Sequence, residues 1–198
     1  MMKTLSDSSP LLSFNFVTFI NDFLQLTKFR LAISVVFSSI AGYLLAVDHI
    51  DSSILMGLLL GGFAMVGASN AFNQWIEKEK DSLMDRTKNR PLPSGRMNNL
   101  TALVIASLLT LVGIFVLNNI NFKTALFGAL SIFIYTCIYT PLKSVTPLSV
   151  FIGAFPGAIP FMLGWVAATG SFGIEPGILF MVQFFWQFPH FWAIGWMM

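Results

Sequence analysis

The sequence contains very few charged residues. Asp, Glu, Lys and Arg make up 10% of its 198 residues, whereas soluble domains carry roughly 25%. A chain this poor in charge cannot cover a soluble surface, and its 56% of hydrophobic residues and mean hydropathy of +0.76 agree with this. These values predict an integral membrane protein. The net charge of +2 provides no broad basic face, which argues against a nucleic acid as partner.

Three other features are missing. The only cysteine is Cys137, so neither a disulfide framework nor a cysteine-based metal site can form. Residues 1–26 lack the basic region and apolar core of a cleavable signal peptide, so the first hydrophobic span is expected to direct insertion. The hydrophobic runs do not alternate with polar residues, as the strands of a membrane barrel would. The sequence therefore favours helices.

Six hydrophobic runs have lengths that suit membrane helices, for which about 20 apolar residues are needed. They cover residues 31–47, 54–75, 100–117, 125–139, 150–168 and 178–196. We expect an all-α, polytopic transmembrane helical bundle. Residues 1–26 are expected to form a cytoplasmic segment, and residues 27–198 the transmembrane domain.

The lysines and arginines are expected to lie almost entirely on one side of the membrane. They precede the first run, crowd the link between the second and third runs, and recur once between the fourth and fifth. With a cytoplasmic N-terminus, all of the eleven basic residues except Lys123 face the cytoplasm. This distribution supports the six runs and their orientation together.

One charged stretch interrupts the hydrophobic sequence, NAFNQWIEKEKDSLMDRTKNRPLPSG at residues 70–95. Asn73, Glu77, Asp81 and Asp85 recur in it at intervals of four. If the second span continues as a helix, they share one face, drifting by about 40° per step. Neighbouring members then lie about 6 Å apart. Oxygen ligands at this spacing suit Mg²⁺, which takes one or two protein carboxylates and completes its shell with water or phosphate.

Basic residues follow these carboxylates directly. Arg86 and Arg90 carry guanidinium groups that match phosphate oxygens in a two-pronged contact. One segment thus offers carboxylates for a metal and arginines for a phosphate, and a metal-bridged diphosphate is a ligand that needs both. The alternative is that the charges only mark the cytoplasmic end of a span. Lys78, Glu79 and Lys80 lie off the shared face and fit that solvated role.

The sequence resembles the UbiA-type intramembrane prenyltransferases. Their first aspartate-rich motif is similar to Asn73-x-x-x-Glu77-x-x-x-Asp81 followed by MDRTKNRPLPSG. Within that superfamily the nearest match is the family of protohaem IX farnesyltransferases. YTPLKSVTPLSVFIGAFPGAIPFMLGWVAATG at 139–170 and WQFPHFWAIGW at 186–196 resemble segments specific to this haem-modifying branch. The resemblance runs from about Thr27 to the end of the chain.

The resemblance implies an all-helical fold of nine spans around a cavity, of which this chain holds six. It also implies Mg²⁺-dependent transfer of a farnesyl group from farnesyl diphosphate to a vinyl group of protohaem IX, giving haem O, in a bacterial cytoplasmic membrane. A downstream haem A synthase is then an expected partner. The family's second acidic motif would follow the sixth span, so we expect the chain to be truncated at its C-terminus and inactive alone.

The family's first motif falls on Asn73, Glu77 and Asp81 of this sequence as catalytic residues. Glu77 and Asp81 are then the expected Mg²⁺ ligands. Glu77 stands where the family more often has Asp, so the charge is kept but the carboxylate is displaced by one methylene.

The family's diphosphate-binding cations fall on Arg86, Arg90 and Lys143. Ser144 stands where a second basic residue often follows the lysine, which would weaken the contact with phosphate. The histidine of the WQFPHF segment falls on His190, which the resemblance places on the haem side.

Other functions remain open from the sequence alone. A prenyltransferase of the same type could act on a quinone precursor, since the first motif does not report the acceptor. A cation-coupled transporter would place its site near the bilayer midplane on broken helices, whereas these carboxylates lie at the cytoplasmic edge beside arginines. A purely structural subunit predicts that Glu77→Ala and Asp81→Ala are tolerated.

Overall fold

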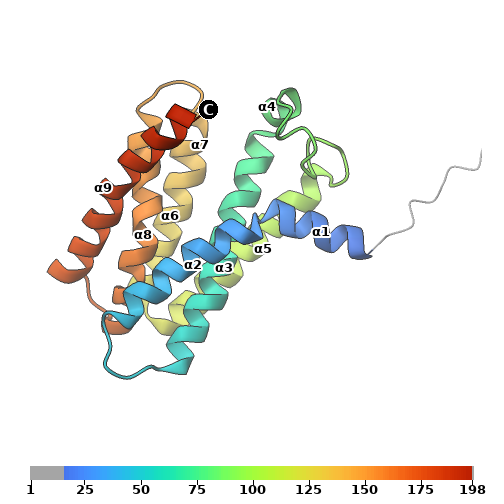
Figure 1. Cartoon of the computed structure of the whole chain (residues 1–198). Helices are drawn as coiled ribbons and strands as arrows, with labels where there is room; N and C mark the ends of the chain where they lie inside the picture. Colours follow the sequence, from blue (N-terminus) through green and yellow to red (C-terminus); the bar gives the residue numbers. More distant parts are fainter. Residues whose placement is uncertain (1–15, 198) are drawn as a thin grey trace, which may run out of the picture.

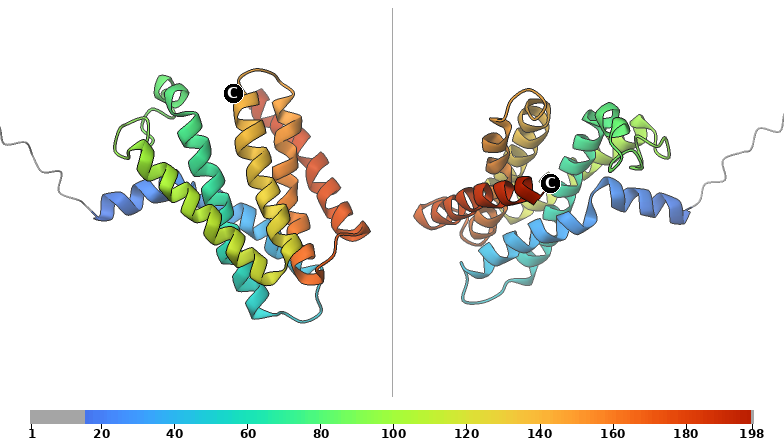
Figure 2. Two further views of the ribbon diagram at one scale, coloured as in Figure 1. Left: turned by 180° about the vertical axis from the view of Figure 1, so that it is seen from behind. Right: turned by 45° about the horizontal axis from the view of Figure 1, so that its top comes forward.

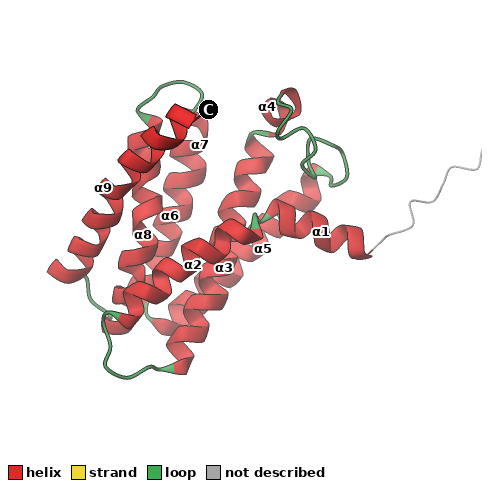
Figure 3. Ribbon diagram, in the orientation of Figure 1, coloured by secondary structure: helices red, strands yellow, loops and turns green. Residues whose placement is uncertain are grey.

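The computed structural model describes residues 16–197, and this part of the chain is helical without strands (Figure 3). Between residues 16 and 197, nine α-helices and one π-helical turn, η1, follow one another. They are α1 (Phe16–Leu26), α2 (Phe29–Leu44), α3 (Ser52–Ile76), α4 (Lys78–Leu83), α5 (Asn99–Ile120), α6 (Phe122–Phe133), η1 (Ile134–Tyr139), α7 (Thr140–Leu142), α8 (Ser149–Thr169) and α9 (Ile174–Met197).

The long helices run up and down between two ends of a bundle (Figures 1 and 2). The α2–α3, α5–α6 and α8–α9 links lie at one end. The α3–α5 and α7–α8 links lie at the other, together with α4. Lys123 begins α6 at the first end, while the charged stretch after α3 lies at the second. The bundle therefore separates these charges as the sequence predicted.

The all-α, multi-pass membrane bundle is confirmed. Four stretches have the length and hydropathy of a span, namely α3, α5, Phe122–Leu142 (α6, η1 and α7) and α8, and α1 with α2 gives a fifth that is bent by 50°. The sequence predicted six. The difference is α9, which is long enough but is not among these stretches, and Gln183, Gln187 and His190 interrupt its apolar residues.

Within the fifth candidate, α2 is the part that we place across the membrane. Asp22 of α1 pairs with Arg96, which precedes α5, over 2.9 Å. Helix α1 therefore lies at the charged end of the bundle. The turn at Thr27 and Lys28 separates it from α2. The division of the chain at residue 26 stays a prediction, although it coincides with this turn.

Close helix packing depends on two glycines between α2 and α8. A Cβ at Gly42 would collide with the backbone oxygen of Phe161, and a Cβ at Gly164 would collide with that of Ser39. Without a hydrophobic driving force inside lipid, helices associate through such close contacts between small residues. This packing fixes α2 beside α8, and both helices line the site described below.

Two irregular helices also shape the interior. Pro160 in α8 has no N–H to donate to the Pro156 carbonyl, and the Ser131 hydroxyl donates to that oxygen at 3.5 Å. In η1 the turn is widened, and the hydroxyl of Thr140 donates to the Tyr135 carbonyl, five residues back, at 2.8 Å. Such π-helical turns are common at functional sites, and this one directs Tyr135 and Tyr139 toward a cavity.

Candidate active site

The carboxylates of the charged stretch stand where α3 ends. Helix α3 stops at Glu77, whose backbone (φ −92°, ψ 5°) is no longer helical, and α4 begins at the next residue. Glu77 and Asp81 remain one turn apart and are both buried, at 8% and 2% exposure. Asp85 lies beyond α4, exposed and paired with Lys88. The continuous helical face predicted for residues 73–85 is therefore wrong beyond Glu77.

Glu77 is held by a residue of the adjoining helix α3 and by one from a distant segment. The Lys143 ammonium donates to its Oε1 and Oε2 atoms at 3.0 and 3.1 Å. Nδ2 of Asn73 donates to Oε2 at 3.1 Å and also to the Thr140 hydroxyl at 3.2 Å. Asn73 and Thr140 are buried. The end of α3 is thus joined to the α7 region by a network centred on one carboxylate.

Asp81 has its own cation. Arg90 donates to its Oδ2 at 2.6 Å, and the buried Thr87 hydroxyl donates to its backbone oxygen at 2.9 Å. The loop that carries Arg90 is anchored by Leu92, which is fully buried among apolar residues of α1, α3 and α5. This anchor fixes the guanidinium over the Asp81 carboxylate.

Lys28 adds a third cation. From the sequence it was expected only to mark the cytoplasmic side of the membrane. It adopts a left-handed backbone (φ 49°), the only non-glycine residue to do so between residues 16 and 197. The pKa of its ammonium is lowered from 10.5 to about 8, mainly by burial and also by the charges of Arg90 and Lys143, while Glu77 and Asp81 act in the opposite direction. Lys28 lies outside the spanning segments, in the turn before α2.

Polar side chains of α3 hold the Lys28 turn in place. Gln74 donates to the carbonyls of Gln25 and Leu26 at 2.9 Å each, and Asn70 donates to that of Thr27 at 3.2 Å. These carbonyls lie at the end of α1 and in the turn that follows it, where helical partners run out. No sequence signal predicts this contact, because the partners are more than 40 residues apart.

An apolar cavity of about 580 Å³ lies next to this charged cluster. Its lining comes from α2, α3, α6, η1, α8 and α9 and includes Asn70, Tyr135, Tyr139 and Gln187. Asn70 stands one helical turn below Asn73, so the cavity begins directly beneath the ionic network. Gln187 is buried and donates to the Ala154 carbonyl at 3.1 Å. From its WQFPHF segment only the histidine was predicted as a site residue.

The structure does not bring all of the predicted residues together. Arg86 is exposed, and within residues 16–197 no hydrogen bond or ion pair to it is found. His190 is exposed and stacks on Trp186, with ring centroids 5.1 Å apart. It does not line the cavity, whereas its neighbour Phe191 does. Asn73, Glu77, Asp81, Arg90 and Lys143 do lie together.

The donor set fits Mg²⁺ as a partial shell. In the described part of the chain no group of three or more His, Cys, Asp or Glu residues converges. Glu77 and Asp81 are two buried carboxylates four residues apart, each paired with a cation. Mg²⁺ is commonly bound in this way, by one or two carboxylates together with substrate phosphate oxygens.

The sequence matches a known family of membrane enzymes. The sequence model described as the UbiA prenyltransferase family matches residues 35–198. The chain belongs to the UbiA prenyltransferase family. Among curated proteins it is similar to the protoheme IX farnesyltransferase of Christiangramia forsetii, with 69% identity over 177 residues, which is 89% of this chain and 59% of that protein. The chain thus spans about three-fifths of this relative's length.

Solved structures show the same fold. A digeranylgeranylglyceryl phosphate synthase matches with a TM-score of 0.75 and 22% identity, over 83% of this chain and 58% of that one. A UbiA homologue from Archaeoglobus fulgidus, solved with GPP and Mg²⁺, matches with a TM-score of 0.68 and 15% identity, over 85% and 62% of the two chains. These helices therefore have the arrangement of the corresponding part of UbiA-type proteins.

Proposed function

We propose that this protein transfers a farnesyl group from farnesyl diphosphate to a vinyl group of protohaem IX in a Mg²⁺-dependent reaction. The observation that carries the proposal is the position of the ionic network at the head of the apolar cavity. Asn73 belongs to the network, and Asn70, one turn away on the same helix, lines the cavity. A prenyl diphosphate has this division between a charged head and an apolar tail.

The head group would be bound by the cations. Arg90 and Lys143 are each paired with a carboxylate across the site, and Lys28 carries a positive charge beside both. A diphosphate placed between them would bind these cations in place of the carboxylates, and Glu77 and Asp81 would then be free to bind the metal. Arg90 can contact two phosphate oxygens at once, whereas the lysines act as point charges.

Mg²⁺ fits the remaining donors. The relevant support is the pair Glu77 and Asp81, together with the Mg²⁺ and GPP present in the solved archaeal homologue. When bound, the ion would supply electrostatic stabilisation of the leaving diphosphate. Glu77 and Asp81 would position it, and Asn73 would orient Glu77 through its hydrogen bond.

The reaction breaks the bond between the first prenyl carbon and the diphosphate oxygen. The electron pair stays with the diphosphate, where Lys28, Arg90 and Lys143 stabilise the developing negative charge. The allylic cation is attacked by the vinyl group, and addition of water with loss of a proton gives the hydroxyethylfarnesyl side chain. Apolar walls keep water from the cation before transfer, and the Tyr135 and Tyr139 rings can stabilise its charge.

Protohaem IX is the acceptor that the relatives support. The curated protein with 69% identity is named for this reaction, and the WQFPHF segment resembles that branch of the superfamily. Gln187 of this segment lines the cavity. We place the protein in a bacterial cytoplasmic membrane with its N-terminus and ionic network on the cytoplasmic side, from the distribution of basic residues.

The proposal is tested with the protein expressed from the full reading frame of its gene. Membranes are incubated with protohaem, farnesyl diphosphate and Mg²⁺, and the extracted haems are separated by mass. A haem heavier by the hydroxyethylfarnesyl increment, absent with EDTA and in Asp81→Ala, is expected. Unmodified haem from correctly inserted, full-length protein would reject haem as the acceptor and direct the same assay to quinone precursors.

A further inference from the structure

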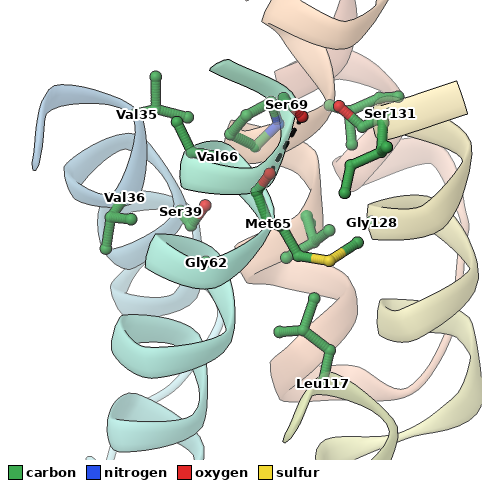
Figure 4. A pocket seen from close by; sticks show the side chains of 14 residues that line it. Val35, Val36, Ser39, Gly62, Met65, Val66, Ser69, Leu117, Gly128 and Ser131 are labelled. Atoms are coloured by element: carbon green, nitrogen blue, oxygen red, sulfur yellow. Dashed lines mark hydrogen bonds between the residues drawn. The ribbon is translucent and has the colours of Figure 1, made fainter. Parts of the chain in front are cut away.

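The apolar cavity continues into a second, smaller chamber. This chamber has a volume of about 50 Å³ and lies deeper among α2, α3, α5, α6 and α8 (Figure 4). Five residues line both spaces, which are Val35, Val66, Ser69, Ser131 and Pro160. The two spaces therefore adjoin, and Ser69 of α3 and Ser131 of α6 stand at the neck between them.

Met65 is one of the residues that line the inner chamber. Its side chain extends from α3 toward α6 above Leu117 of α5 (Figure 4). Glycines make room for it: a Cβ at Gly113 would lie 2.6 Å from its sulfur, and a Cβ at Gly128 would lie 3.1 Å from its Cε and 2.9 Å from a Leu117 methyl. Met65 is only 6% exposed. Methionine fills irregular apolar space, and Met65, packed closely against Gly113 and Gly128, forms the floor of the chamber.

The depth of this floor can be compared with prenyl chains. Met65 lies eight residues before Asn73 on α3, which is about 12 Å along a helix. Extended chains advance by about 1.2 Å per bond, as in the peptide backbone. The main chain of a geranyl group then spans about 8 Å, that of a farnesyl group about 13 Å and that of a geranylgeranyl group about 18 Å. The farnesyl length alone ends at Met65.

We propose that Met65, supported by Leu117, is the residue that limits the length of the prenyl group in this protein. The inference rests on the proposed function, because it places the diphosphate at the level of Asn73 and the tail along α3. A geranyl tail of about 8 Å reaches just past the level of Ser69, which lies about 6 Å from Asn73 along α3, and ends about 4 Å short of Met65. A geranylgeranyl tail collides with Met65 and the packed glycines behind it.

The test is a competition among prenyl donors. Full-length protein in membranes receives equal concentrations of geranyl, farnesyl and geranylgeranyl diphosphate with limiting protohaem, and the products are counted by mass. In Met65→Ala the ratio of geranylgeranyl to farnesyl product is expected to rise about tenfold, the usual discrimination for one oversized group. Ser69→Leu fills the neck instead and is expected to raise the geranyl share.

Matched variants separate this effect from a loss of folding. Met56→Ala makes the same change on the exposed side of α3, where Met56 is 51% exposed, and is expected to leave the product ratios unchanged. Met65→Leu keeps the side-chain volume and is expected to keep the farnesyl preference. If the unchanged protein transfers farnesyl but the product ratios stay the same in both Met65→Ala and Ser69→Leu, the inference about Met65 is wrong and the proposed function stands. No transfer by the unchanged protein would instead overturn the proposed function.

Discussion

The ammonium nitrogen of Lys143 lies 3.0 Å from Oε1 of Glu77, although 66 residues separate them in the chain. This contact joins the end of α3 to the link between α7 and α8. The side chain of Glu77 is 9% exposed and that of Lys143 is 48% exposed. Because the lysine is half exposed, solvent weakens the attraction within the pair, and its importance is expected to lie in binding rather than in folding.

Loss of either buried carboxylate is expected to abolish most turnover. Glu77→Ala and Asp81→Ala remove the two metal donors, and we expect the rate to fall by about 10²–10³-fold, as for loss of a preorganised electrostatic group. The measurement is farnesyl transfer by purified full-length protein, with membrane insertion checked separately. Glu79→Ala is the control, since Glu79 is exposed on the adjacent turn. Normal activity of Glu77→Ala and Asp81→Ala would favour a structural subunit.

The two predicted arginines are expected to behave differently. Arg90 contacts Asp81 at 2.6 Å, whereas Arg86 is exposed. Arg90→Lys keeps the charge but loses the planar pair of donors, so the KM for farnesyl diphosphate should rise about tenfold or more, in proportion to the loss of one charge-assisted hydrogen bond. Arg86→Lys should change it less than twofold. A larger effect at Arg86 would contradict the site as the structure arranges it.

The sequence predicted the site through its spacing and the fold through its composition. Glu77 and Asp81 were identified because residues four apart share a helix face, and the contact of Glu77 with Lys143 agrees with the predicted topology. The end of α3 at Glu77 was not predicted, because the network that replaces the helical continuation is formed by residues distant in the sequence. Asp85 was included in the predicted face because the helix was expected to continue past Glu77.

Lys28 and α9 are two further features that the sequence did not predict correctly. Lys28 joins the cluster because Asn70 and Gln74 hold its turn, and a left-handed lysine has no sequence signature. In α9 a window of apolar residues predicted a sixth span, but its glutamines lower the hydropathy. Gln187 is instead satisfied inside the protein, by the Ala154 and Gln183 carbonyls.

The contact between α2 and α8 gives a stability prediction. A methyl group at Gly164 would meet the backbone of Ser39 and Tyr43, which cannot move without separating the helices. Gly164→Ala should destabilise the bundle by about 1–3 kcal/mol, the usual cost of overpacking. The measurement is the melting temperature of the detergent-solubilised protein. Gly177→Ala in α9 meets no atom within 4 Å and should melt like the unchanged protein.

Lys28 gives a prediction about pH. Burial and the charges of Arg90 and Lys143 lower its pKa to about 8, against Glu77 and Asp81. In the free protein the ammonium therefore loses its proton as the pH rises through about 8, and the site loses one positive charge for the diphosphate. The KM for farnesyl diphosphate should rise between pH 7 and pH 9, by up to about tenfold if one charge-assisted contact is lost.

Two variants distinguish this charge from other titrations of the site. Lys28→Arg stays protonated throughout the range, so its KM for farnesyl diphosphate should remain level from pH 7 to pH 9. Lys28→Met carries no charge at any pH, so its KM should be raised and equally level. The KM of the unchanged protein should rise from the first of these values toward the second as Lys28 loses its proton. A rise in KM above pH 8 that persists in Lys28→Met would assign the titration to another group and remove Lys28 from the diphosphate site.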